Sequence, residues 1–433
     1  MIQPQILPTN ISNHHHMPVH VSNEISQLRR VIIHRPDEGI ARISPKRAEE
    51  LLFDDIVYLP KMQEEHDIFR KTLEAFIGAE NVLETRDLML AAIQHDQDNK
   101  EWVIDQILLY EELPQNFRKH LKDLSDEELT DVLITGYDPK RDHYLFDPIP
   151  NFIFTRDIAV TINDHILITK ASKEARYREN FLTRFMIYGN PIFSKLKEEN
   201  RFINLNHVDE FPPSKRGEYV GVEGGDVMIL NKDYLLVGYS ERTTQHGIHS
   251  LRDALFHRGV VKNVVQVNIP ADRSIMHIDT VFTQIDNDDI VCYKPLVLDG
   301  LASNVVVHRD NGTTMHYHSI AEFLRSEINP QFRFILAGNG ESPYQEREQW
   351  TDGCNLVAIR PGVALTYDRN PHTEIAFREA GYDIVHATDF LKQVEAETLD
   401  PQQIRKTIIT LPSNELSRAR GGSHCMTCPI ERE

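Results

Sequence analysis

The sequence predicts an α/β protein in which a repeated unit of strands and helices closes radially, with one helical segment inserted. The main observation is a pattern that occurs four times, in which two β-rich runs flank a short polar turn, as in a β-hairpin. These places are residues 152–169, 226–240, 279–293 and 355–369. A unit of this kind cannot bury its apolar face alone, so repetition with radial closure is the expected arrangement.

The N-terminal part contributes a candidate fifth unit. A strand is expected at VIIH, residues 31–34, and a helix at residues 62–78, where apolar residues recur at helical spacing before a glycine. Residues 1–22 are expected to form a flexible lead. Its short tract of histidines, His14 to His16 and His20, favours a solvated tail over a metal site.

Residues 86–147 are expected to form the helical insertion. Their apolar residues follow helical periodicity, strand patterns are almost absent, and Ser125 with Glu128 has the spacing of a capping box. Residues 23–85 and 148–433 would then make up the α/β catalytic domain.

Composition and charge exclude several classes of protein. The 433 residues are 40% hydrophobic and 26% charged, which is ordinary for a globular chain. The net charge of −19 disfavours nucleic acid and anionic membrane surfaces as partners. The N-terminus lacks an export signal and no apolar run is long enough to span a membrane, so we expect a cytoplasmic protein. We also expect a homo-oligomer, although no motif identifies its interface.

The run RGGSHCMTCPI, residues 420–430, places Cys425 and Cys428 three positions apart behind glycines. A zinc knuckle needs four ligands, and the other cysteines, Cys292 and Cys354, lack paired spacing. A thioredoxin-like redox pair opens a helix after a strand, whereas this pair lies in a glycine loop. Because glycines let a backbone approach a ligand closely, the run favours a nucleophile at Cys425 or Cys428.

A cysteine nucleophile acts as a thiolate and needs a partner that moves protons, for which His277 is the candidate. His277 and Asp279 alternate in an expected strand, so both side chains should face one side. Radial closure would bring Asp157 and Glu223 to the same place. Carboxylates around a developing oxyanion would be unfavourable for acyl transfer. A guanidinium fits better, because two carboxylates can hold its forked N–H donors while the sulfur meets its carbon.

At this point the motifs resemble those of the arginine deiminase family. The matching runs are LRRVIIHRP, LLFDDI, NFIFTRD, EGGDVM, SERT, MHIDTVF, EREQWTDG and RGGSHCMTCPI, in order from about residue 23 to 431. The resemblance implies a five-bladed α/β propeller, or pentein, of the guanidino-group-modifying superfamily. It also implies hydrolysis of L-arginine to L-citrulline and ammonia through a covalent S-alkylthiouronium, without metal or organic cofactor.

The resemblance further implies roles for single residues. Cys425 would be the nucleophile and His277 the general acid and base, while Asp157 and Asp279 clamp the guanidinium and Glu223 touches both guanidinium and imidazole. Cys428 would be a bystander.

A second set of residues would bind the rest of the substrate. Arg176 and Arg242, assisted by Asn151, would hold the α-carboxylate, which favours arginine over agmatine because agmatine would leave two cations unpaired. Phe154 would pack on the substrate stem, and Arg420 would belong to a mobile loop that covers the site. The backbone carbonyls of Leu52 and Ala419 would bind the substrate α-amino group.

Two positions depart from the family pattern. Ala419 and Ser423 stand where the family often has glycine, and each added Cβ restricts the backbone of the loop. The alternatives are an agmatine or dimethylarginine hydrolase, an amidinotransferase, or a non-catalytic metal protein that uses the Cys-x-x-Cys pair and the histidine tract.

Overall fold

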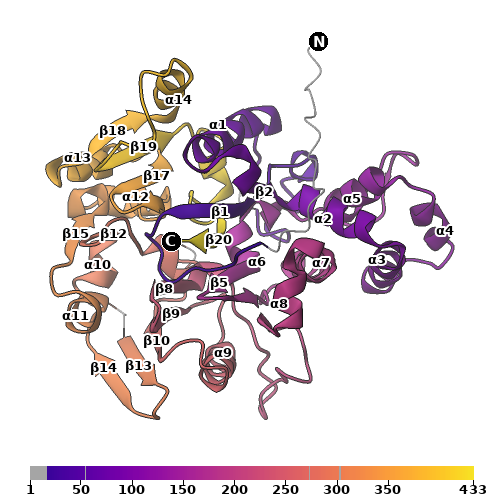
Figure 1. Ribbon diagram of the computed structural model, residues 1–433, viewed down its shortest axis with the longest axis horizontal. Coiled ribbons are helices and arrows are strands. Elements are labelled where there is room, and N and C mark those ends of the chain that lie inside the picture. Colours follow the sequence, from indigo (N-terminus) through magenta and orange to yellow (C-terminus); the bar gives the residue numbers. More distant parts are fainter. Residues whose placement is uncertain (1–16, 54, 273, 302–303) are drawn as a thin grey trace.

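The computed structural model describes residues 17–433 except 54, 273 and 302–303 (Figure 1). Most of the expected lead, with His14 to His16, therefore lies outside the described residues. Within them, five of the six sheets contain the same three-strand module: two antiparallel strands, then a third strand parallel to the second. A helix-containing crossover leads from the second strand to the third, as parallel pairing requires.

The first two modules combine the ends of the chain with the segment that follows the insertion. In the first, β20 pairs with β1 and β1 with β2, so the N- and C-terminal parts share one sheet. In Figure 1 this sheet lies among the others near the middle of the molecule. The strands and crossover helices are β20 (Cys428–Arg432), β1 (Leu28–Ile33), α1 (Leu59–Ile77) and β2 (Val82–Glu84), then β5 (Ala159–Ile162), β6 (His165–Ile168), α7 (Tyr177–Gly189), α8 (Ser194–Glu198) and β7 (Phe202–Asn204).

The other three modules follow in chain order, and two of them carry extra strands at one edge. The third module consists of β8 (Val227–Asn231), β9 (Tyr234–Tyr239), α9 (Gln245–His257) and β10 (Asn263–Asn268), and its sheet is extended by β13 (Asn304–Arg309) and β14 (Thr314–Tyr317). The fourth consists of β11 (Phe282–Gln284), β12 (Asp289–Cys292), α10 (Lys294–Val297), α11 (Ile320–Phe323) and β15 (Arg333–Leu336). The fifth consists of β16 (Val357–Arg360), β17 (Val363–Tyr367), α13 (Pro371–Glu379), β18 (Asp383–His386), α14 (Ala387–Glu395) and β19 (Thr407–Leu411). The helix α12 (Tyr344–Trp350) precedes β16.

The structure confirms the four expected hairpins and the expected strand and helix of the N-terminal unit, but it shortens two of the hairpins. Residues 152–158 are not a strand: the 3-10 helix η3 (Pro150–Ile153) and α6 (Thr155–Ile158) precede β5. Proline at the first helical position suits that start. His277 and Asp279 likewise do not alternate in a strand, because η7 (Ile278–Thr280) follows His277. The predicted geometry of that pair was therefore wrong.

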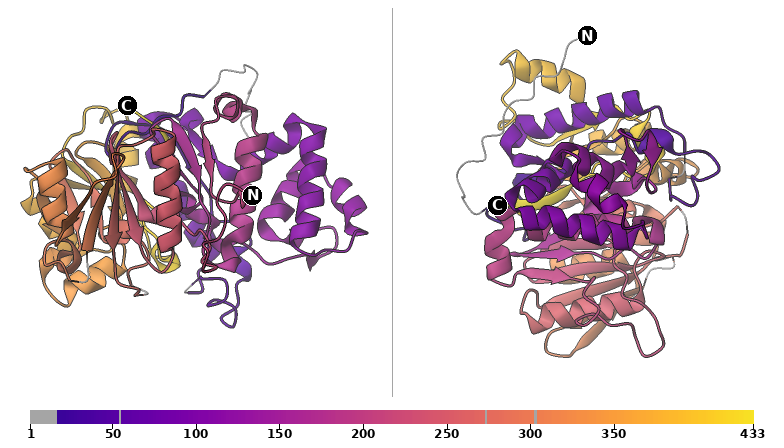
Figure 2. Two further views of the ribbon diagram at one scale, coloured as in Figure 1. Left: turned by 90° about the horizontal axis from the view of Figure 1, so that it is seen from below. Right: turned by 90° about the vertical axis from the view of Figure 1, so that its right-hand side faces the viewer.

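Four helices follow β2: α2 (Thr85–His95), α3 (Gln97–Tyr110), α4 (Phe117–Lys122) and α5 (Asp126–Thr135). A short antiparallel hairpin comes after them, whose strands β3 (Tyr137–Asp138) and β4 (His143–Tyr144) have two residues each. The Ser125–Glu128 capping box is present at the start of α5. Figure 1 and the left view of Figure 2 place α3–α5 on the side of the molecule away from α13 and α14. Buried residues of this segment, such as Met89 and Leu133, share a hydrophobic core with Phe181 of α7. Burial of that shared core holds the segment against the sheets.

The described helices include none that is long and apolar enough to cross a lipid bilayer.

Candidate active site

The loops that enter four modules lie around one cavity of about 340 Å³. Asp157 precedes β5, Glu223 precedes β8, His277 precedes β11 and Cys425 precedes β20. Equivalent positions in the repeated unit therefore supply the reactive side chains. All of the predicted site residues line this cavity except Glu223 and Asp279, which lie directly behind it in contact with lining residues; those that line it are Leu52, Asn151, Phe154, Asp157, Arg176, Arg242, His277, Ala419, Arg420 and Cys425.

Arg176 holds the two carboxylates Asp157 and Glu223 together. Its Nη1 donates to Asp157 Oδ2 at 2.7 Å and to Glu223 Oε2 at 3.0 Å, and its Nε donates to Glu179 at 2.9 Å. All four side chains are buried. The Arg176 guanidinium therefore contacts Asp157 and Glu223, two of the three carboxylates that the sequence interpretation assigned to the guanidinium of the substrate.

His277 is placed by backbone and carboxylate contacts. Its Nε2 lies 3.0 Å from Glu223 Oε2, and its Nδ1 lies 3.8 Å from Asp157 Oδ1. Gly225 packs against the ring so closely that a Cβ there would lie 2.5 Å from Nδ1. Asp226 accepts hydrogen bonds from the Ile278 backbone and from Ser240, which fixes the loop that carries His277.

The charge of this imidazole is strongly stabilised. Burial disfavours the imidazolium, but the carboxylates of Asp157, Glu223 and Asp226 outweigh burial and raise the pKa of His277 to about 10. The same burial raises the pKa of Asp226 to about 6. At neutral pH His277 is therefore a proton donor.

The raised pKa predicts how stability depends on pH. An imidazolium favoured in the folded state stabilises it fully below the ordinary pKa of 6.5, and that contribution is lost as pH rises toward about 10. We expect the free energy of unfolding of the substrate-free protein to fall over this window more steeply than that of His277→Gln. Denaturant titrations of both proteins at the two ends of the window measure the difference. Equal declines would contradict the assignment.

Cys425 lies beside both acceptors and donors. Its Sγ lies 3.4 Å from Asp279 Oδ2 and accepts a hydrogen bond from Asn355 Nδ2 at 3.2 Å. Burial, together with the charges of Asp279, Asp157 and Asp352, raises the pKa of the Cys425 thiol well above its usual range. In the substrate-free site the group is a thiol, and an added cation would favour the thiolate.

A chain of buried polar groups supports Asp279 from behind. His424 Nδ1 lies 2.9 Å from Asp279 Oδ2, and its Nε2 lies 3.4 Å from Glu24 Oε2. Glu24 in turn accepts a hydrogen bond from Arg156 at 2.5 Å. Burial alone would raise the pKa of Asp279, but the hydrogen bond with His424 and the nearby His277 and Arg156 hold that pKa below its ordinary value, so Asp279 is a carboxylate.

In the three predicted catalytic carboxylates, Asp157, Glu223 and Asp279, two oxygens are buried without a hydrogen-bond partner among the described residues. They are Glu223 Oε1 and Asp279 Oδ1. Arg242 Nη1 lies 3.8 Å from the first of these oxygens. An unpaired buried carboxylate oxygen costs free energy, so these two atoms are acceptors suited to a ligand with several N–H donors.

The remaining predicted residues form the walls of the cavity. Asn151 donates from Nδ2 to the Leu51 carbonyl at 2.8 Å, and its own carbonyl lies 3.4 Å from Arg176 Nη2. Leu52 adopts a positive φ of 57°, which is uncommon for a residue with a side chain. Ala419 ends the 3-10 helix η10 (Leu416–Ala419). Ser423 is buried, and its hydroxyl donates to the Leu365 carbonyl at 2.7 Å, so this departure from glycine anchors the loop.

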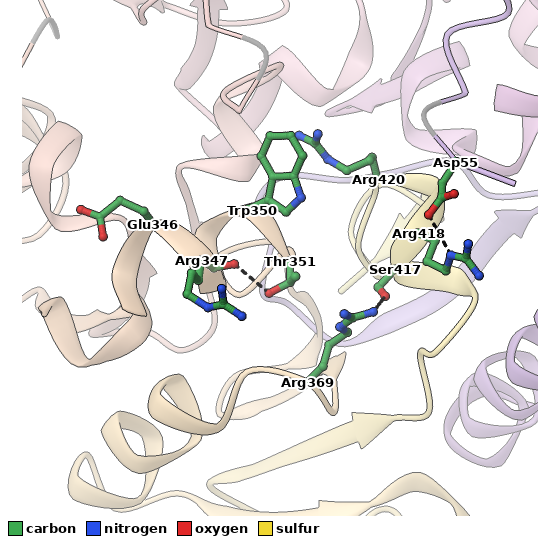
Figure 3. A pocket seen from close by; sticks show the side chains of 9 residues that line it. All are labelled: Asp55, Glu346, Arg347, Trp350, Thr351, Arg369, Ser417, Arg418 and Arg420. Atoms are coloured by element: carbon green, nitrogen blue, oxygen red, sulfur yellow. Dashed lines mark hydrogen bonds and ion pairs between the residues drawn. The ribbon is translucent and has the colours of Figure 1, made fainter. Parts of the chain in front are cut away.

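A second cavity of about 610 Å³ borders the first, with Arg420 lining both (Figure 3). The Arg420 guanidinium lies 3.4 Å from the ring centroid of Trp350, a cation–π contact, and its backbone has a left-handed φ of 61°. Asp55 accepts from Arg418 Nε at 2.9 Å on the same wall. Arg420 therefore connects the loop that carries Cys425 to helix α12.

The two neighbouring cysteines have different surroundings. Cys425 packs in the core cluster that contains Phe154 and Met426, whereas Cys428 packs in the cluster that contains Ile158. Burial raises the pKa of Cys428 to about 12, and its Sγ lies 3.2 Å from the Ala159 carbonyl. All four thiols are free. This arrangement favours a single reactive thiol over a redox pair.

Asp157, Glu223 and His277 could also hold a metal ion, since one ligand atom from each lies within 4.8 Å of the others. Arg176 already places a positive charge against two of these ligands. These three side chains could therefore bind either a guanidinium group or a metal ion.

Sequence reasoning missed several groups that contact the reactive residues: Glu24, Glu179, Asn355 and His424. His424 and Asn355 lie inside or next to the quoted motifs, and adjacency to Cys425 was a usable signal for His424. Glu179 lies three positions after Arg176, so that contact is local, whereas Glu24 is 132 positions from Arg156 and 400 from His424, and its contacts depend on the tertiary structure.

Comparisons with known proteins agree with this geometry. The family model described as arginine deiminase matches residues 49–141 and 137–432. An arginine deiminase of Limosilactobacillus fermentum is 35% identical over 96% of this chain and 99% of the relative, and one of Pediococcus pentosaceus is 34% identical over 96% and 98%.

Among solved structures, an amidinotransferase of saxitoxin biosynthesis from Microseira wollei has a TM-score of 0.51 at 13% identity, covering 96% of this chain and 98% of the other. The N-terminal domain of ArgZ, a cyanobacterial arginine dihydrolase, has a TM-score of 0.50 at 13% identity, covering 94% and 98%. These two show that the fold is shared with guanidino-group-modifying enzymes. With the family model and the relatives covering nearly its whole length, the chain belongs to the arginine deiminase family.

Proposed function

We propose that this protein hydrolyses L-arginine to L-citrulline and ammonia through a covalent intermediate on Cys425. The observation that carries the proposal is a buried guanidinium between Asp157 and Glu223, next to a thiol whose neighbouring acid has an unpaired oxygen. The site thus has the acceptors for a second, substrate guanidinium. The two relatives, both arginine deiminases, support the same substrate.

Arg176 must move when arginine binds. Two guanidinium groups cannot share the position between Asp157 and Glu223, because both are cations that need the same acceptors. The substrate guanidinium would take this place and use the unpaired oxygens of Glu223 and Asp279. Arg176 would then turn toward the substrate α-carboxylate, where Arg242 and Asn151 also lie.

The first half of the reaction forms a carbon–sulfur bond and breaks a carbon–nitrogen bond. The substrate cation favours the Cys425 thiolate, which attacks the guanidinium carbon. The His277 imidazolium gives its proton to the departing nitrogen, so ammonia leaves and the S-alkylthiouronium retains one positive charge. Dividing the displacement of a resonance-stabilised group into two steps is the advantage of covalent catalysis.

The second half reverses the roles of the proton carrier. Neutral His277 takes a proton from water, and the resulting hydroxide attacks the thiouronium carbon. The carbon–sulfur bond then breaks, the thiolate of Cys425 is restored, and loss of the hydroxyl proton yields the ureido group of citrulline. That proton is available to convert ammonia to ammonium.

The five three-strand modules support closure into a five-bladed propeller around this site, with α2–α5 as an insertion near residues 86–147. Cycling between thiol, thiouronium and water uses only side chains of this chain, so the proposed reaction needs no metal or organic cofactor. The cytoplasmic location and the homo-oligomeric state stay predictions of the sequence.

A substrate comparison tests the proposed function. We expect ureido product from arginine at a rate far above that from agmatine or dimethylarginine, with activity retained in a chelator. Arg242→Gln should raise KM for arginine by about 10-fold to 100-fold, since hydrogen bonds to charged groups contribute about 1.5–3 kcal/mol, and should leave agmatine turnover nearly unchanged. Quantified citrulline and ammonia give both constants.

The comparison also separates the alternatives. Equal rates on agmatine would remove the role given to Arg242. Amidino transfer to an added amine, with ornithine instead of citrulline as product, would indicate an amidinotransferase. Loss of activity in the chelator with recovery on added zinc would indicate a metal enzyme at Asp157, Glu223 and His277.

A further inference from the structure

Asn355 is the fifth counterpart of the reactive residues. Asp157, Glu223, His277 and Cys425 each lie two to five residues before the first strand of a module, and Asn355 lies two residues before β16. It is fully buried. The last module therefore also supplies a polar side chain to the centre of the molecule.

We propose that Asn355 is a catalytic residue of this enzyme, whose amide N–H holds and stabilises the Cys425 sulfur as the thiolate that attacks the substrate. This inference rests on the proposed function, in which Cys425 is the nucleophile.

The amide can adopt only one orientation. The Cys425 backbone N–H donates to Asn355 Oδ1 at 3.1 Å, which requires oxygen on that side. On the other side Nδ2 donates to the Asp279 carbonyl at 3.2 Å, which can only accept. An amide nitrogen has two hydrogens, so the second one is available to Cys425 Sγ at 3.2 Å.

The loop sequence is built to keep this amide in place. A Cβ on Gly422 would lie 2.6 Å from Asn355 Oδ1 and 2.7 Å from the Asn355 carbonyl, so only glycine lets the loop close over Asn355. The Ser423 hydroxyl lies 3.3 Å from the same carbonyl. The backbone N–H of Asn355 donates to the Asp352 carbonyl at 3.0 Å.

The surroundings of the sulfur make such a donor necessary. Asp279 lies 3.4 Å from Sγ, and Asp157 and Asp352 add negative charge nearby, so the thiolate is opposed from several sides. A backbone hydrogen bond from Gly422 acts in the opposite direction. Asn355 adds a neutral N–H donor, which stabilises an anion without competing with the substrate cation for the carboxylates.

The test measures the thiolate separately from turnover. Iodoacetamide alkylation of Cys425, mapped by peptide mass spectrometry, is followed against pH in wild type, Asn355→Leu and Asn355→Asp without substrate. The leucine removes the donor at similar size, and the aspartate places a carboxylate against the sulfur. We expect the midpoint of the alkylation profile to rise from wild type to Asn355→Leu and further to Asn355→Asp.

Steady-state kinetics supply the second readout. With arginine we expect kcat to fall about 10-fold to 100-fold in Asn355→Leu, in line with a hydrogen bond to a charged group, and more in Asn355→Asp, while KM changes little. Asn370→Leu is the matched control: Asn370 is also buried and bonds through both amide atoms to Thr351, away from Cys425. It should leave the alkylation midpoint of Cys425 unchanged.

Two results would overturn the inference. One is an unchanged alkylation midpoint in folded Asn355→Leu, because the donor would then not act on the sulfur. The other is an equal shift in Asn370→Leu, because the effect would then be general. Failure of the proposed function looks different: wild type would form no citrulline, or Cys425→Ala would remain active.

Discussion

Cys425→Ala is expected to abolish citrulline formation, with a fall in kcat on the order of 10⁴-fold to 10⁶-fold, as found when an enzyme loses its nucleophile. In the proposed reaction the sulfur forms the covalent bond, and no described neighbour can replace it, because the adjacent side chains are carboxylates, an imidazole and an amide. Arginine should still bind, since the carboxylates and Arg242 remain. Citrulline assays together with isothermal titration of arginine measure both properties.

Cys428→Ala provides the matched control for this variant. The two cysteines lie three positions apart, but Cys428 packs in a different core cluster and lies outside the cavity. We expect kcat within about threefold of wild type and a lower thermal stability, because removing a buried side-chain atom leaves a small void. An active Cys425→Ala, or an inactive and folded Cys428→Ala, would contradict the assignment of the nucleophile.

His277→Gln is expected to lower kcat for arginine by about 10²-fold to 10⁴-fold for each proton transfer that it supports. The imidazolium donates to the leaving nitrogen in the first half of the reaction and the imidazole activates water in the second. Glutamine retains a hydrogen-bond donor toward Glu223, so the carboxylates stay in place while proton transfer is lost. Steady-state citrulline formation over a range of pH measures the effect.

An arginine analogue with a thioether leaving group separates the two roles of His277. Methanethiol needs less help from an acid than ammonia does, so His277→Gln should still form the adduct with S-methyl-L-thiocitrulline. Without water activation the adduct should accumulate on Cys425, where intact-mass spectrometry detects it. Rapid turnover with no adduct would show that another group activates water, and absence of both would show that His277 is needed for the attack itself.

The protonation states of His277 and Cys425 before substrate binding also follow from the structure. In the substrate-free site the Cys425 thiol is neutral, because burial and nearby carboxylates raise its pKa, and His277 carries a proton, because the carboxylates outweigh the opposing effect of burial on its pKa. Attack needs the thiolate together with the imidazolium. Entry of a permanently charged guanidinium is the event that favours this combination, so the substrate itself activates the nucleophile.

Much of the site could be predicted from residue types. A thiol, an imidazole and several acids placed at the entrances of repeated hairpins indicated guanidinium chemistry, since only a planar cation suits that set. The hairpins could be predicted because their strands alternate locally and their turns carry polar residues. The strand expected through His277 and Asp279 was wrong, because tertiary contacts of Asp226 with the Ile278 backbone favour a 3-10 turn there.

The sequence by itself determined the repeated α/β units, the helical segment, the reactive cysteine loop and the family. Only the tertiary structure decided that Arg176 lies between Asp157 and Glu223, and that Asn355 and His424 contact the Cys425 sulfur and Asp279. The reason is physical: local patterns depend on neighbours along the chain, whereas charge pairing and hydrogen bonding at the centre depend on five modules meeting in space. Those contacts join residues 19 to 400 positions apart, as in Arg176–Asp157 and His424–Glu24.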